Sequence, residues 1–201
     1  MGTNVRTSLF KFAAAVAVLA VGAPGAARAD DVFLGVFDHG LFANAHVEHG
    51  ADLMAGYRTA PIRGWTWLAR PSVDIFISAN SAVSTDFASV GLNWPLTIGF
   101  DGRLYVRPGF GIAYTTGEAN VGNSADLTVS PAEHERRLHL SETRIDFGSH
   151  WLFSPEAAIG YRVTPKIAIE AAYVHLSNGQ IFHHGKNQGL DDVGLRMAYS
   201  F

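Results

Sequence analysis

The carboxyl-terminal segment, residues 189–201, alternates apolar residues with small or polar ones and ends on Phe201. Successive side chains of a β-strand point to opposite faces, so this pattern predicts one apolar and one polar face. A strand of this kind that closes on an aromatic residue is typical of the last strand of an outer-membrane β-barrel. We therefore expect the chain to enter a membrane with strands.

The same period-two alternation recurs along the rest of the chain, and many of the segments approach the roughly 9–11 residues that a tilted strand needs to cross a bilayer. A soluble sandwich also alternates, but it buries its apolar face and does not need aromatic residues near its strand ends. Here aromatic residues do lie near the strand ends, like the girdles of membrane barrels. The pattern predicts an all-β protein, an eight-stranded antiparallel transmembrane β-barrel with paired charges in its narrow lumen. The predicted strands are residues 32–37, 51–58, 65–77, 88–100, 103–114, 151–162, 167–177 and 192–201.

The amino-terminal segment has the features of an export signal. Arg6 and Lys11 supply positive charge, an apolar run follows, and Ala27-Arg28-Ala29 forms a small-residue cleavage site. The apolar run is well short of the roughly 20 residues that a membrane-spanning helix needs. We expect residues 1–29 to be a cleaved signal peptide and residues 30–201 to form the barrel domain.

Composition excludes several classes of function. The chain has 201 residues, a net charge of -3 and no cysteine. Nucleic acid is therefore an unsuitable partner, and disulfides and thiolate metal sites are excluded. The connections after the second, fourth and sixth strands are expected to be short, and residues 116–147 form the longest connection. Short turns of such barrels face the periplasm, which places both termini there.

Three polar residues lie close together near the outer end of the last two strands. His175 and Ser177 continue the odd-numbered, lipid-facing positions of the seventh strand, and Asp191 continues the lipid-facing positions of the eighth. An antiparallel register that pairs His175 with Asp191 would bring their Cβ atoms to about 4.5–5.5 Å. Serine, histidine and a carboxylate are the residue types of a serine hydrolase, and Asn178 or nearby backbone amides could donate to an oxyanion.

Other interpretations of the polar residues remain open at this stage. A histidine two residues before a serine is a weak motif, and both residues also suit the point where a strand leaves the bilayer. The histidines in the connecting segments lack paired ligand spacing and are expected to be solvated, so no metal and no cofactor is predicted. Arg136, Arg137 and Arg144 could contact phosphate groups of a lipid, although a solvated loop is the favoured explanation.

Residues 144–201 resemble the outer-membrane lipid A 3-O-deacylase family, also described as acyloxyacyl hydrolase-like. The similarity rests on His175-Leu176-Ser177-Asn178, on residues 187–191 and 194–196, and on the terminal Phe201; residues 147–162 and 108–114 match more weakly. The resemblance implies an eight-stranded barrel with a Ser/His/acid triad on its lipid-facing surface. Ser177 would be the nucleophile, His175 the base, Asp191 the acid and Asn178 the oxyanion contributor. The family pattern has glutamate where this chain has Asp191.

The resemblance also implies the substrate. The enzyme would be an outer-membrane esterase that removes the ester-linked 3-hydroxyacyl chain at position 3 of lipid A, with lipopolysaccharide of the outer leaflet as its partner. A homodimer is compatible with the sequence. Two alternatives stay open from the sequence: a structural or adhesive barrel without activity, and an esterase that acts on phospholipid.

Overall fold

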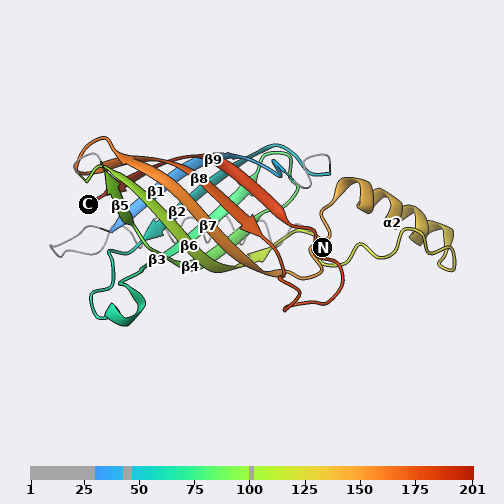
Figure 1. Cartoon of the computed structure of the whole chain (residues 1–201). Coiled ribbons are helices and arrows are strands. Elements are labelled where there is room, and N and C mark those ends of the chain that lie inside the picture. Colours follow the sequence, from blue (N-terminus) through green and yellow to red (C-terminus); the bar gives the residue numbers. More distant parts are fainter. Residues whose placement is uncertain (1–29, 43–46, 100–101) are drawn as a thin grey trace.

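The computed structural model describes residues 30–42, 47–99 and 102–201 (Figure 1). The predicted signal peptide, residues 1–29, lies outside the described residues and stays a prediction. One antiparallel sheet with the order β4-β3-β2-β1-β9-β8-β7-β6-β5 contains all of the strands within those ranges. The strands are β1 (Asp31–Asp38), β2 (Ala51–Arg58), β3 (Ser72–Asn80), β4 (Phe87–Asn93), β5 (Leu96–Gly99), β6 (Leu104–Thr115), β7 (Trp151–Arg162), β8 (Ile167–Leu176) and β9 (Leu190–Ser200).

The sheet closes on itself because β4 also pairs with β6. Strands β4 and β5 both pair with β6 and together form one barrel strand, which is interrupted at Trp94-Pro95. Proline has no backbone N–H to donate to a neighbouring strand, so a break in the ladder at this position is expected. The result is the closed eight-stranded antiparallel barrel that the alternation predicted.

The two ends of the barrel differ in their connections. Helix α2 (Pro131–Thr143) projects from one end, and the carboxyl terminus lies at the other (Figure 1). The prediction of a short connection after the second strand was wrong. Residues 59–71 form a longer connection that contains the 3-10 helix η1 (Thr66–Leu68), so Trp65 and Trp67 lie outside β3. Pro61 and Pro71 lie within this connection, and Ala69 and Arg70 adopt left-handed backbone conformations that do not fit a strand.

The helix α2 corrects a second expectation, because the segment that contains Arg136 and Arg137 was interpreted as a solvated loop. The hydroxyl of Ser130 accepts a hydrogen bond from the backbone N–H of Glu133, and Pro131 occupies the first turn. A capping serine followed by proline, with glutamate three residues after the serine, is a sequence signal for a helix start. No residue of α2 is buried. Among the described residues, no helix is long and apolar enough to cross a membrane.

The outer wall of the barrel is apolar, as the alternation predicted. Leu34, Val36, Leu53, Val90, Ile112, Ile159, Ile169, Leu195 and Met197 are exposed on it. Such a band of apolar side chains suits contact with lipid acyl chains.

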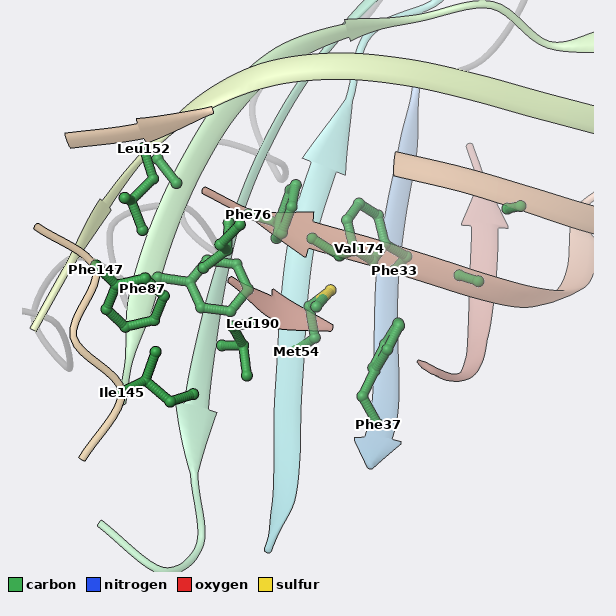
Figure 2. Close-up of a cluster of buried hydrophobic side chains, with 14 of the residues drawn as sticks. Phe33, Phe37, Met54, Phe76, Phe87, Ile145, Phe147, Leu152, Val174 and Leu190 are labelled. Carbon is green, nitrogen blue, oxygen red and sulfur yellow. The ribbon is translucent and has the colours of Figure 1, made fainter. Parts of the chain in front are cut away.

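The inner face contains more apolar side chains than the sequence interpretation allowed. Phe33, Phe37, Met54, Phe76 and Phe87 point inward and pack with residues from β7, β8, β9 and the connection before β7 (Figure 2). Phe76 contacts both Phe33 and Phe87, with ring centroids 6.2 and 6.0 Å apart. An eight-stranded barrel is just wide enough for side chains to fill it, and aromatic rings here fill part of its interior.

A buried ionic cluster occupies the lumen as well, as predicted. Arg58 donates two hydrogen bonds to Glu170, at 3.2 and 3.1 Å. Arg196 bridges Glu170 and Glu156, and the hydroxyl of Tyr105 also donates to Glu170 at 2.7 Å. Charged side chains without access to water need such mutual pairing, so the cluster ties together strands from opposite sides of the barrel.

Candidate active site

The antiparallel pairing of β8 with β9 places His175 directly opposite Asp191. The ring nitrogen Nδ1 of His175 lies 2.7 Å from Oδ1 of Asp191. This is the register that the sequence predicted, and the shorter aspartate side chain spans the gap between the strands. A carboxylate only accepts hydrogen bonds, so Nδ1 is the donor in this contact, and in the neutral imidazole Nε2 then keeps its lone pair.

Ser177 lies immediately beyond β8, where it forms a bridge with Phe153 at the start of β7. Its backbone N–H donates to the carbonyl of Phe153 at 3.1 Å, and its carbonyl accepts from the N–H of Phe153 at 2.7 Å. The backbone of the serine is therefore fixed to a neighbouring strand. His175 and Ser177 are both half-buried. Within the part of the chain that the structure describes, no hydrogen bond joins the Ser177 hydroxyl to His175.

Gly189 has no side chain, and the imidazole of His175 occupies the space where one would lie. A Cβ atom at this position would lie 2.7 Å from Cε1 of His175 and 3.2 Å from the carbonyl oxygen of Leu176. Any side chain here would push the ring away from its present place. The sequence interpretation gave Gly189 no role, because an approach between a glycine and a residue 14 positions earlier depends on how the loop returns to the barrel.

Asn178 has a different set of partners from those expected of an oxyanion donor. Its side-chain amide donates to the carbonyls of Phe147 and Lys186, at 2.7 and 2.8 Å, and its Oδ1 accepts from the N–H of Gln180 at 2.7 Å. The residue is fully buried. Both amide hydrogens are thus engaged in this conformation, and the side chain joins residues 177–189 to the connection before β7.

A second contact between these two segments involves Gln188. The N–H of Asp146 donates to the Gln188 side-chain oxygen at 2.7 Å, and the N–H of Gln188 donates to the Asp146 carbonyl at 3.0 Å. Gly148 lies in the same place with a positive φ of 71°, and a Cβ there would be 2.1 Å from the carbonyl oxygen of Lys186. The segment that follows Ser177 is therefore held in one position by hydrogen bonds and close packing.

Aromatic residues flank the site on the outer wall. On one side Phe42 contacts the ring of Tyr173 edge-on, with centroids 6.4 Å apart. On the other side Phe182 packs against Phe153 with centroids 4.7 Å apart. Phe42 and Phe182 are both exposed. The polar site is thus bordered by apolar surface that a lipid chain can contact.

A buried polar cluster lies inside the barrel below the site. Nδ1 of His39 is 2.9 Å from Asp52, and Nε2 is 3.2 Å from Glu48. Asp192 is buried as well and lies 3.7 Å from the His39 ring. Among the described residues, His39, Asp52 and Asp192 form a group whose potential ligand atoms lie within 4.8 Å of one another.

The contacts of His39 explain this cluster without a metal ion. A ring that faces carboxylates through both nitrogens donates from both when it is protonated. Burial by itself lowers the pKa of His39, but hydrogen bonds to Asp52 and Glu48, with the charges of Asp52 and Asp192, raise it to about 10. His39 is therefore a buried cation that the surrounding carboxylates stabilise.

All three arginines considered for phosphate contacts form ion pairs within the protein. Arg136 and Arg137 both bind Glu133, with contacts of 2.8 and 2.7 Å, one turn away on α2. Arg144, just after the helix, lies 3.8 Å from Glu48. Helix α2, which carries Arg136 and Arg137, projects from one end of the barrel (Figure 1).

Structural comparison finds outer-membrane and designed membrane barrels. The crystal structure of the outer membrane enzyme PagL shares 13% identity, with a TM-score of 0.57, and the match covers 85% of this chain and 99% of that one. A de novo designed transmembrane β-barrel shares 15% identity with a TM-score of 0.50, covering 89% of this chain and 100% of the design. At these identities the likeness establishes the fold.

Sequence comparison identifies the family. No curated protein sequence matches the chain. The family model described as lipid A 3-O-deacylase (PagL) matches residues 49–200, which include both strands of the candidate site. With its closed barrel and apolar outer wall, the chain is an outer-membrane protein, and it belongs to the PagL family of lipid A deacylases.

Proposed function

We propose that this protein is a serine esterase that hydrolyses the ester-linked 3-hydroxyacyl chain at position 3 of lipid A. The observation that carries the proposal is the 2.7 Å contact between His175 and Asp191 on the outer wall, with His175 two positions before Ser177. The family membership supports lipid A as the substrate class. A site on the outer wall is accessible to a lipid that diffuses within the membrane.

In this proposal each member of the triad has its own role, and the contact between His175 and Asp191 supports the first of them. Asp191 holds the Nδ1 proton of His175, which leaves Nε2 as the base. Ser177 Oγ attacks the ester carbonyl carbon while its proton passes to Nε2. That proton then moves to the sugar oxygen as the ester C–O bond breaks, and an acyl-enzyme remains. Water, activated in the same way by Nε2, releases the hydroxy fatty acid and restores the serine.

The stabilisation of the oxyanion needs a different assignment from the one that the resemblance implied. The Asn178 side chain already donates to two carbonyls, at 2.7 and 2.8 Å. We propose that Asn178 contributes by fixing the segment after Ser177, and that backbone amides near Ser177 donate to the developing charge. Donors of that kind act best when they are held in place before the reaction.

The test is a mass spectrum of lipid A from cells that express the wild type or Ser177→Ala. Wild type should remove one 3-hydroxyacyl chain. Ser177→Ala should lose this activity by a factor of about 10³ or more, because the nucleophile is gone. Ser141→Ala is a matched control, since Ser141 is an exposed serine on α2, within the connection before β7.

Each result has a definite meaning for the proposal. Full activity in Ser177→Ala would overturn the assigned nucleophile. An unchanged spectrum with folded wild type in the outer membrane would overturn lipid A as the substrate. The appearance of lysophospholipid instead would favour the phospholipid esterase. Folding of each variant is checked by the altered gel mobility of an unboiled barrel.

A further inference from the structure

Tyr173 makes a contact with the proposed acid of the triad that the resemblance did not imply. Its hydroxyl donates a hydrogen bond of 2.6 Å to Oδ1 of Asp191. The same oxygen binds Nδ1 of His175 at 2.7 Å. One carboxylate oxygen therefore lies between the imidazole and the phenol, at short distances from both.

The strand geometry explains how the phenol reaches the acid. Tyr173 precedes His175 by two positions on β8, so both side chains point to the outer face. Tyr173 pairs with Val193 and His175 pairs with Asp191. Asp191 is thus the diagonal neighbour of Tyr173 on the adjacent strand, a separation that a long aromatic side chain can bridge.

The tyrosine is itself held in place from the other side. Phe42 packs edge-on against its ring, with centroids 6.4 Å apart and an interplanar angle of 60°. The segment that carries Phe42 is anchored at the same point of β9, because the N–H of Leu41 donates to the Asp191 carbonyl at 2.9 Å. Phe42 therefore holds the phenol ring, and Leu41 holds the backbone of the acid.

We propose that Tyr173 is a positioning residue of the catalytic site, which orients Asp191 through its hydroxyl and so fixes the ring of His175. The inference rests on the proposed esterase function of Ser177, His175 and Asp191. A donor in addition to the imidazole, on the same carboxylate oxygen, further restricts rotation of Asp191 about its side-chain torsions. The phenol does not transfer a proton in the reaction.

The first experiment compares Tyr173→Phe with wild type on lipid A in purified, folded enzyme. The variant keeps the ring that Phe42 contacts and loses only the hydroxyl. We expect kcat to fall by about tenfold or more, the range for loss of a hydrogen bond to a charged group, while KM stays the same. The midpoint of the acidic limb of the pH–rate profile should also move. The carboxylate of Asp191, which contacts His175, loses the hydrogen bond from the Tyr173 hydroxyl. Tyr161→Phe is the matched control, since Tyr161 is exposed on the same outer wall, on β7.

A double-mutant cycle identifies the route of the effect. If Tyr173 acts through Asp191, Tyr173→Phe should cost no further activity in an Asp191→Ala background. Equal losses in both backgrounds, or full activity with an unchanged pH profile in Tyr173→Phe, would overturn the positioning role. These outcomes are separate from failure of the proposed function, which would appear as equal activity of wild type and Ser177→Ala.

Discussion

At the scale of single residues, the proposed site depends on how closely the groups around His175 approach one another. Asp191 takes the place where the family pattern has glutamate, and it still reaches His175 at 2.7 Å. Register explains this, because residues directly opposite on paired strands are near enough for a short side chain. A longer acid is not needed at this position, and the 2.6 Å contact from Tyr173 adds a second constraint on it.

Gly189 offers a test of that closeness. In Gly189→Ala the new Cβ would lie 2.7 Å from Cε1 of His175, so the ring must move. We expect activity to fall by about 10²-fold, the cost of misplacing a catalytic group by about 1 Å, with the barrel still folded. Steady-state kinetics on lipid A measure the loss.

Gly64→Ala is the matched control for this substitution. No atom lies within 4 Å of a Cβ at Gly64, so activity should be unchanged. Wild-type activity in Gly189→Ala would show that the ring tolerates displacement and would contradict the assigned role of His175 in its present position.

At the scale of elements, the segment after β8 is held in place by side chains that form hydrogen bonds to neighbouring loops. Asn178 joins Phe147, Lys186 and Gln180 through its amide, and Gln188 binds Asp146 in both directions. This segment carries no regular secondary structure over most of its length. Its order depends on these contacts, which also place Gly189 against His175.

Substitution of Asn178 by aspartate should loosen the segment. Asn178→Asp keeps the shape of the side chain, but its carboxylate would face the carbonyls of Phe147 and Lys186 without a hydrogen to donate. We expect a local cost of about 1–3 kcal/mol, the penalty for buried groups left unsatisfied. Limited proteolysis should cut residues 179–188 faster than in wild type, while the barrel itself stays resistant to the protease. Deacylation should also become slower.

Asn123→Asp is a suitable control for this experiment, because Asn123 lies in the same group of outer connections and its side chain accepts a hydrogen bond at an exposed position. Equal protease sensitivity of wild type and Asn178→Asp would show that the Asn178 contacts do not hold the segment.

At the scale of the whole molecule, buried charges help to hold the barrel together. The pKa of His39, in the turn beyond β1, is raised to about 10 from an ordinary value of 6.5. Folding therefore favours the protonated ring. This contribution to stability is fully present below pH 6.5, declines between pH 6.5 and 10, and is lost above pH 10.

The replacement His39→Gln should remove that dependence. Below pH 6.5 the variant should be less stable than wild type by about 3–5 kcal/mol, the cost of leaving buried charges without their partner. The difference should shrink as the pH approaches 10. Urea unfolding of the lipid-reconstituted barrel at both ends of this range measures it. A difference that stays constant with pH would contradict a protonated His39.

Prediction from sequence succeeded where the information was local. Alternation identified the strands, the outward faces and the ionic pairs of the lumen, because the period of two follows from backbone geometry alone. It was wrong about residues 59–71, because Trp65 and Trp67 are two positions apart, as on one face of a strand, but lie in a connection. It also missed α2, although Ser130 and Pro131 signal a helix start. The residues that support the site were not predictable, because their partners are distant in sequence.

The sequence by itself determined that the chain is an antiparallel barrel with His175, Ser177 and Asp191 on one face, since parity along a strand decides which way a side chain points. Only the tertiary structure decided what surrounds them. The return of residues 177–189 puts Gly189 behind the ring of His175 and engages both amide hydrogens of Asn178. The docking of the first turn on β9 brings Phe42 against Tyr173. Such contacts depend on how loops fold back over the strands, which no periodicity in the chain encodes.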